Sequence, residues 1–172
     1  TLFPYTTLCR SRVTSRRAAV RSVLAVVSAS RVSPPVRSAT ATRKGSERIV
    51  RAAFEFARKH GRKKVTIVHK ANVVRASDGV FLEEAKKVAK DYPGIQTDDA
   101  NIDAIGMWLL KNPFNYDVLV APNLYGDIIS DLCAQMVGGL GFGCSGNIGE
   151  KLAVFEPTHG SAPKHAGLNK AN

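Results

Sequence analysis

Cysteine is scarce in this chain of 172 residues, and its three cysteines form no functional pattern. Cys9, Cys133 and Cys144 include no CxxC pair and no spacing typical of a metal site. An odd number of cysteines argues against a disulfide framework and fits a reducing compartment. The sequence also lacks any apolar run near the roughly 20 residues that a membrane helix requires. We therefore expect neither a disulfide scaffold nor a membrane partner.

Acidic residues are absent from positions 1–46, which carry eight Arg and one Lys. The remaining positions hold 16 basic and 14 acidic residues, so the net charge of +11 arises mainly from this N-terminal segment. An Arg-rich, Ser-rich and acid-free composition is typical of a mitochondrial transit peptide, and also of a basic arm that binds polyanions. We favour a third interpretation, in which segment 1–41 is not native, because its first eleven residues resemble a translated sequencing adaptor.

The expected organisation is thus a non-native or disordered basic segment at 1–41, followed by a partial domain at 42–172. We expect the sequence from residue 42 to start partway through a domain whose first part is missing. The C-terminal end also looks truncated, because the chain stops after a loop without a closing helix. The expected location is the cytoplasm, or the mitochondrial matrix if the protein is eukaryotic and the segment is a real transit peptide.

From Thr42 onward, helical periodicity alternates with short buried strands. Helices are expected from an N-cap at Ser46 to Gly61, after Asp78-Gly79 to Tyr92, over 102–110, and from Gly126 to Val137. Strands are expected at 65–68, 117–121 and 152–155, and five glycines between 139 and 149 indicate a loop. This alternation predicts an α/β fold, and a hydrophobic content of 44% suffices for a real core.

Asp127 and Asp131 are the sharpest chemical feature, because a spacing of four places both carboxylates on one helix face. A helix N-terminus would stabilise their charge, and two hard oxygen ligands suit Mg²⁺ or Mn²⁺. The alternative is a solvated pair on an exposed face. Apolar neighbours such as Ile128 and Leu132 predict that the helix is mostly buried, which makes the metal site and the solvated pair about equally good interpretations of this spacing alone.

Other candidates are weaker in isolation. Lys70 follows a buried strand and could relay a proton, although a lysine at a sheet edge often only keeps its charge in water. Asp103 is a single acid on an apolar helix and could be purely structural. The small residues Gly160 and Ala162 in His159–Pro163 would let backbone N–H groups approach a phosphate, but a tight turn explains them equally well.

Taken together, these segments resemble the isocitrate/isopropylmalate/homoisocitrate dehydrogenase family. The resemblance spans about Thr42 to Asn172 and rests on ordered motifs: TRKGSER at 42–48, VHKAN at 68–72, NLYGDIISD at 123–131, GGLG at 138–141, SGNIG at 145–149 and HGSAP at 159–163. It implies an isopropylmalate-dehydrogenase-like sheet with flanking helices, incomplete because the N-terminal half and the C-terminal end are missing. The family's arginine cluster, nicotinamide-side loop and catalytic tyrosine lie in the missing half, so we expect the chain alone to be inactive.

The resemblance also implies roles for matched residues. Asp127 and Asp131 correspond to metal carboxylates, and Asp103 to a third one that is supplied to the neighbouring subunit's metal. Lys70 corresponds to a lysine that enters the partner's site and assists proton transfer at the substrate hydroxyl, with Asn72 beside it. The adenosine part of NAD or NADP would be held by the matched residues His159, Gly160, Ala162 and Asn172. Sharing of Lys70 and Asp103 implies a homodimer with shared active sites.

The implied reaction is the metal-dependent oxidative decarboxylation of a 2-hydroxy acid with NAD or NADP. His69 and the NLYGD string favour isocitrate, while homoisocitrate and isopropylmalate remain alternatives. Lys164 stands where NAD-using members usually carry an acid, and a cation suits the 2′-phosphate of NADP. The opening motif, however, is more similar to the NAD-using branch, so the coenzyme stays open.

Two other functions compete with this one. A non-catalytic regulatory subunit of the family tends to lose the metal carboxylates or the lysine, and all four are present here. A nucleic-acid-binding protein built on residues 1–46 would need support such as interleaved aromatic residues, which that segment lacks. We therefore expect no nucleic-acid partner.

Overall fold

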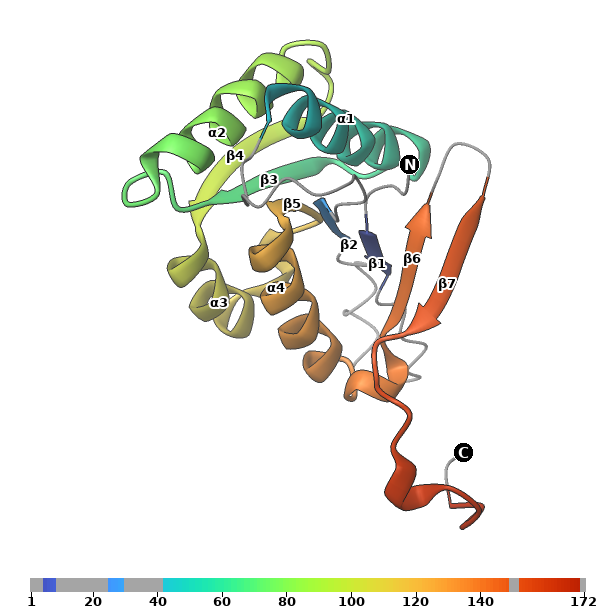
Figure 1. Ribbon diagram of the computed structural model, residues 1–172. Coiled ribbons are helices and arrows are strands. Elements are labelled where there is room, and N and C mark those ends of the chain that lie inside the picture. Colours follow the sequence, from blue (N-terminus) through green and yellow to red (C-terminus); the bar gives the residue numbers. More distant parts are fainter. Residues whose placement is uncertain (1–4, 9–24, 30–41, 149–151, 171–172) are drawn as a thin grey trace.

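The computed structural model describes residues 5–8, 25–29, 42–148 and 152–170 (Figure 1). Its helices are α1 (Arg43–Lys59), α2 (Arg75–Ala89), α3 (Ile102–Lys111) and α4 (Asn123–Met136). Its strands are β1 (Tyr5–Leu8), β2 (Ala25–Ala29), β3 (Lys64–His69), β4 (Gln96–Asn101), β5 (Val118–Pro122), β6 (Cys144–Ile148) and β7 (Ala153–Pro157). Short 3₁₀ helices occur at η1 (Pro113–Asn115), η2 (Leu140–Phe142) and η3 (Pro163–His165).

The described strands form one mixed sheet in the order β4-β3-β5-β2-β1-β6-β7. Neighbours among β4, β3, β5 and β2 are parallel, whereas β1, β6 and β7 are added in antiparallel pairs. Helices connect the parallel strands, as such crossovers require. The α/β class with a parallel sheet and flanking helices is thereby confirmed.

Two hydrophobic cores lie on opposite faces of the sheet, α1 and α2 covering one face and α3 and α4 the other (Figure 1). Successive side chains of a strand point to opposite faces. Accordingly, Val65 and Ile67 of β3 belong to the first core, and Val68 belongs to the second. Both faces of β3 are therefore buried, which explains its continuous run of β-branched residues.

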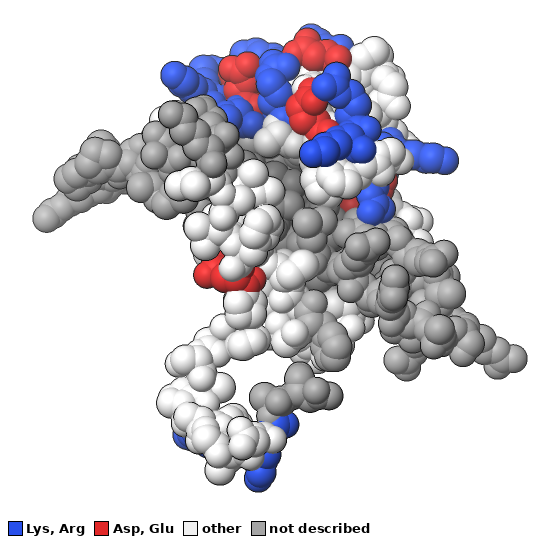
Figure 2. All heavy atoms as spheres, turned by 90° about the vertical axis from the view of Figure 1, so that its right-hand side faces the viewer, with Lys and Arg blue, Asp and Glu red and all other residues white. Residues whose placement is uncertain are grey.

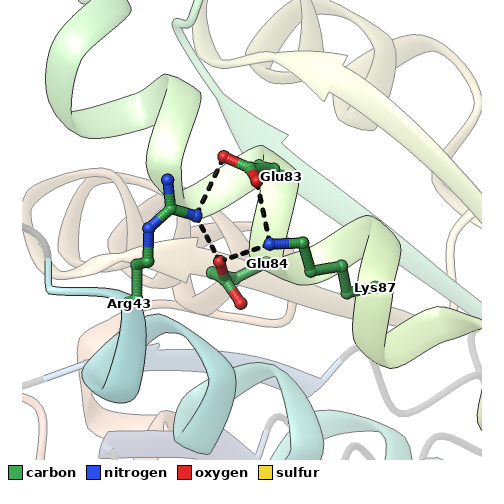
Figure 3. Close-up of polar contacts among 4 residues, drawn as sticks. All are labelled: Arg43, Glu83, Glu84 and Lys87. Atoms are coloured by element: carbon green, nitrogen blue, oxygen red, sulfur yellow. Dashed lines mark hydrogen bonds and ion pairs between the residues drawn. The ribbon is translucent and has the colours of Figure 1, made fainter.

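Ion pairs join α1 to α2 on the outer surface (Figure 3). Arg43, the first residue of α1, contacts Glu83 at 2.9 Å and Glu84 at 2.5 Å, and Lys87 contacts the same two carboxylates at 2.8 and 3.0 Å. The ammonium of Lys87 and the guanidinium of Arg43 lower the pKa values of Glu83 and Glu84. These acids offset the unfavourable placement of a cation at the N-terminus of α1.

Several helix boundaries differ from the expectation. Thr42, not Ser46, caps α1, because its Oγ1 accepts a hydrogen bond from the Gly45 N–H at 3.1 Å. Ser46 is instead buried inside the helix. Helix α2 begins before Asp78, and α4 begins at Asn123 rather than at Gly126.

Within residues 42–172, strands β4 and β6 were not expected from the sequence. Strand β4 consists of QTDDAN, which has no hydrophobic pattern because the strand lies at the sheet edge. Strand β6 lies inside the expected glycine loop and pairs with β7, which runs over 153–157 rather than 152–155. Gly143 precedes β6, and a Cβ there would meet Thr158 Oγ1 at 2.6 Å, so close packing requires this glycine.

Strands β1 and β2 come from segment 1–41, which the sequence analysis set apart from the fold. β2 pairs in parallel with β5, and β1 connects β2 to β6. The sheet thus includes residues from this segment, and the proposed division near Thr42 stays a prediction. Within the described ranges, no helix is long and apolar enough to span a membrane.

Candidate active site at the carboxyl ends of the strands

Lys70 and Asp103 meet where two neighbouring parallel strands end. Lys70 directly follows β3, and Asp103 lies in the first turn of α3, directly after β4. Because His69 pairs with Asn101 in register, both residues leave the sheet at the same level. Lys70 Nζ lies 2.6 Å from Asp103 Oδ1, and this ammonium lowers the pKa of Asp103.

Two buried side chains fix the backbone turn that carries Lys70. Asp78 Oδ2 accepts a hydrogen bond from the Lys70 N–H at 2.7 Å, and His69 Nδ1 accepts one from the Ala71 N–H at 3.0 Å. Asp78 is 5% exposed and His69 is 6% exposed, so water does not compete strongly for these bonds. Asn72 lies exposed in the same turn. The backbone position from which the Lys70 side chain extends is therefore set by the fold.

The tautomer of His69 follows from this geometry. Since Nδ1 accepts a hydrogen bond, a neutral ring carries its proton on Nε2 and donates to Asp99 Oδ2 at 3.1 Å. Burial alone would raise the pKa of Asp99, but the hydrogen bond from His69 and the charge of Lys86, 3.4 Å away, lower it.

Tyr125 connects the Lys70 turn to α4. It lies in the first turn of α4, and its hydroxyl hydrogen-bonds to the Asp78 carboxylate. Burial and this hydrogen bond raise the pKa of Tyr125 to about 12. The sequence analysis missed this role of Asp78, although an acid beside a glycine at an expected helix start is a signal for a backbone contact.

Asp127 and Asp131 both lie exposed on α4, within two turns of Tyr125. Burial and the charge of Asp131 raise the pKa of Asp127. Stabilisation by the helix N-terminus was therefore a wrong expectation, because α4 begins at Asn123 and its first turn contains no acid. The helix is also less buried than expected: Ile128 is 54% exposed.

The two carboxylates fit a divalent cation as a ligand pair. Their repulsion is unrelieved within the described residues, where no ion pair reaches either one, and hard oxygen ligands suit Mg²⁺ or Mn²⁺. Among the described residues, however, no third His, Cys, Asp or Glu joins them to form a metal-binding group. Asp103 is thus not brought to this pair within one chain.

The expected adenosine segment lies apart from these residues, extending away from the sheet beyond β7 (Figure 1). His159, Gly160, Ala162 and Lys164 are all exposed. Ala162 adopts a left-handed conformation with φ of 45°, and Thr158 Oγ1 donates to the Leu140 carbonyl at 2.8 Å, which ties the segment to η2. Asn172 lies outside the described residues.

Comparison with known proteins gives a family match over residues 29–172, to the model described as isocitrate/isopropylmalate dehydrogenase. The chain belongs to the isocitrate/isopropylmalate dehydrogenase family. A crystal structure of isocitrate dehydrogenase from Methylococcus capsulatus superposes with a TM-score of 0.85 at 40% identity, covering 96% of this chain and 54% of that chain.

Curated relatives within the family carry different names. The 3-isopropylmalate dehydrogenase of Archaeoglobus fulgidus is 54% identical over 131 residues, which cover 76% of this chain and 40% of the relative. The homoisocitrate dehydrogenase of Methanocaldococcus jannaschii is 53% identical over 131 residues, covering 76% of this chain and 38% of the relative. The chain thus spans about 40% of the length of such relatives.

Proposed function

We propose that this chain forms part of an enzyme that oxidatively decarboxylates isocitrate to 2-oxoglutarate, using NAD or NADP and a divalent cation. The observation that carries the proposal is the Lys70–Asp103 pair, 2.6 Å apart, at the strand ends from which α4 also starts. In open α/β sheets, such ends are the usual place of a binding site. Family membership supports the reaction class, since its members are named as dehydrogenases.

Lys70 is the proposed proton carrier at the substrate hydroxyl oxygen. Its Nζ is held by Asp103, and its backbone is held by Asp78 and His69, so the ammonium is positioned before substrate binds. Asn72, exposed in the same turn, would donate to a substrate oxygen.

Asp127 and Asp131 would hold Mg²⁺ or Mn²⁺ through their carboxylate oxygens. The chemistry that such a cation would supply is Lewis-acid stabilisation of negative charge on the substrate's oxygens, which would favour loss of the hydroxyl proton. Partial burial and the neighbouring charge of Asp131 raise the pKa of Asp127, and a cation bound between the two carboxylates would lower this pKa.

A homodimer would complete the site. Asp103 pairs with Lys70 in its own chain and does not join Asp127 and Asp131, so a second copy is the proposed source of the third carboxylate. Helices α3 and α4 support this arrangement, because they contact each other and expose large apolar side chains next to these acids. The most exposed of these are Met107, Leu110, Leu124 and Ile128, at 57, 64, 64 and 54%.

The segment around His159, Gly160, Ala162 and Asn172 is the proposed adenosine site. His159, Gly160 and Ala162 are exposed, so a ligand can reach them. Lys164 is exposed on η3 and would bind the 2′-phosphate of NADP, so we propose NADP as the better coenzyme.

The first test measures oxidation of D-isocitrate by the full-length protein with Mn²⁺ and either NAD⁺ or NADP⁺. Turnover that Asp127→Asn loses, together with weakened Mn²⁺ binding in that variant, is the expected result. Asp91→Asn is the matched control, since Asp91 forms an ion pair with Arg51 on the surface, away from the candidate site. If homoisocitrate or isopropylmalate were turned over and isocitrate were not, the proposed reaction type would stand and the substrate assignment would change.

The second candidate is a regulatory role within the same family. It is favoured by one relative from Dictyostelium discoideum, named as a mitochondrial regulatory subunit of NAD isocitrate dehydrogenase, which is 52% identical over 132 residues, covering 76% of this chain and 37% of the relative. Absence of turnover with all three substrates, and of Mn²⁺ binding, would favour this candidate over an enzyme. Sedimentation analysis checks the dimer separately, and a monomer at micromolar concentration would overturn the shared site.

A further inference from the structure

A cavity of about 580 Å³ lies at the other end of the sheet from the candidate active site. It is lined by the turn after α1 (60–64), by Gln96 and by residues 114–117. Strands β3, β4 and β5 begin at this cavity, whereas Lys70 and Asp103 follow the opposite ends of β3 and β4. The six residues of β3 separate the two places by about 20 Å. We name it the amino-end cavity.

Its basic wall is formed by Arg62, Lys63 and Lys64, which end the acid-free stretch RKHGRKK at 58–64. Arg58, Arg62 and Lys64 form ion pairs with Glu55, Asp117 and Asp98, respectively. Lys59 and Lys63, by contrast, have no carboxylate within ion-pair distance in the described part of the chain. Figure 2 shows Lys and Arg, interspersed with Asp and Glu, in the upper part of the face that it presents, where α1 and α2 lie.

The acid that lines the cavity is already occupied. One carboxylate oxygen of Asp117 accepts from Arg62 at 3.1 Å, and the other accepts from the Lys63 N–H at 2.8 Å. These bonds hold the turn rigid while the ammonium of Lys63 stays exposed. The cavity therefore offers an uncompensated positive charge on a fixed backbone, which attracts an anion.

The cavity lining also includes two aromatic residues, Phe114 and Tyr116. Phe114 is 56% exposed. Tyr116 lies next to it, with Lys64 Nζ 5.4 Å from its ring centroid. An exposed aromatic ring offers a surface on which a planar ligand ring can stack.

We propose that the amino-end cavity binds a nucleotide, with Lys63 contacting its phosphates and Phe114 stacking on its base. A concave volume of about 580 Å³ falls within the range of small-molecule sites. Neither a bare phosphate nor an uncharged aromatic compound would use both the basic wall and the aromatic residues. The cavity is separate from the adenosine segment at 159–172, so the proposal is independent of the proposed enzyme activity.

Calorimetric titration of the full-length protein with ATP, in EDTA and at about 0.15 M ionic strength, tests this site. Lys63→Ala is expected to weaken ATP binding about tenfold, because a charge-assisted contact is lost. Phe114→Ala is expected to weaken it about fivefold to tenfold through loss of stacking. Both side chains are exposed, so neither change should impair folding.

Lys44→Ala and Lys164→Ala are the controls, and neither should alter ATP affinity by more than about twofold. Lys44 is exposed at the far end of the 17-residue α1, and Lys164 belongs to the adenosine segment. Equal weakening by Lys44→Ala would indicate non-specific charge attraction, and weakening by Lys164→Ala alone would assign ATP to the adenosine segment. Pyrophosphate binding as tight as ATP binding would exclude stacking of the base on Phe114. Absence of saturable ATP binding would exclude the site altogether. Any one of these four results would overturn the proposal.

Discussion

The Lys70 turn and the His159–Lys164 segment both follow a strand, yet the protein holds them very differently. Asp78 and His69, both buried, accept hydrogen bonds from two consecutive N–H groups of the Lys70 turn. The His159–Lys164 segment is exposed throughout, and its tie to η2 is the hydrogen bond from Thr158 to Leu140. One part of the candidate site is thus fixed by the core, while the other lies on the surface.

This contrast suggests a division of labour. A proton carrier must lie within a fraction of an ångström of its target, so its backbone benefits from buried anchors. A segment that binds a large coenzyme can order on binding and recover the cost from many contacts. Substitution of the buried anchors of the Lys70 turn should therefore affect catalysis and folding together, whereas substitution in the exposed segment should affect binding alone.

The largest expected effect is on turnover, from Lys70→Met. Removal of the ammonium eliminates the proposed proton carrier, and such groups contribute about 10²- to 10⁴-fold to rate. Steady-state kinetics of the full-length protein should show this loss in kcat. The free energy of unfolding should change little, because the Asp103 side chain is 66% exposed and ion pairs at exposed sites contribute little to stability. Turnover within about threefold of the original would remove Lys70 from the chemistry.

Asp78→Ala should lower kcat about a hundredfold, because the Lys70 N–H loses its buried acceptor and a displacement near 1 Å suffices for such a loss. The unsatisfied N–H should also lower the free energy of unfolding by about 1–3 kcal/mol, measured by urea denaturation. Asp78→Asn keeps an oxygen acceptor and should restore most of the activity.

The matched control for Asp78 is Asp91→Ala, which removes a surface acid paired with Arg51. Its effect on stability should stay within about 0.5 kcal/mol. If Asp78→Ala turned over substrate as fast as Asp91→Ala, the buried anchor would be unnecessary, and the contrast between the two segments would lose its functional meaning.

Asp127 is an intermediate case, because it is carried on a helix but lacks a stabilising partner. Partial burial and the charge of Asp131 raise its pKa, so its ionisation costs folding free energy that develops as the pH rises from the ordinary to the raised pKa and is fully present above it. Without metal at pH 7, Asp127→Asn should therefore raise Tm, by no more than about 3 °C. The difference should shrink as the pH falls below the raised pKa, and it should vanish below the ordinary pKa of an aspartate, where the carboxyl is neutral in both the folded and the unfolded protein. A lower Tm for the variant at pH 7 would contradict this sign.

Hydrophobic periodicity was sufficient to predict the parts of the fold whose burial is one-sided or complete. Strands β3 and β5 and all four helices were expected near their observed positions, since their apolar residues repeat with the period of each element. Strand β4 was not, because QTDDAN carries acids that pair with Lys64, His69 and Lys86 from neighbouring elements. Its strand identity depends on tertiary contacts that no local pattern contains.

The candidate site divides in the same way. The spacing of Asp127 and Asp131 correctly predicted that both lie on one helix. The predicted start of that helix was wrong, however, and the expected stabilisation of the Asp127 charge by the helix N-terminus was therefore wrong as well. The closeness of Lys70 and Asp103 depends on the register between β3 and β4, across 33 positions of sequence. Family resemblance assigned both residues roles in one shared site, whereas the bridging role of Asp78 required the structure.

The smallest expected effect comes from Gly160→Ala, compared with Gly143→Ala. A Cβ at Gly160 would meet no atom within 4 Å, so the free energy of unfolding should stay within about 0.5 kcal/mol. At Gly143 a Cβ would lie 2.6 Å from Thr158 Oγ1 and 3.1 Å from Ala134 Cβ, so overpacking should cost about 1–3 kcal/mol. Urea denaturation of both variants provides the stability comparison, and titration with NADP⁺ should show weakened binding for Gly160→Ala. Equal destabilisation by the two changes would mean that the exposed segment is held as firmly as the core, and that its glycine serves folding rather than coenzyme binding.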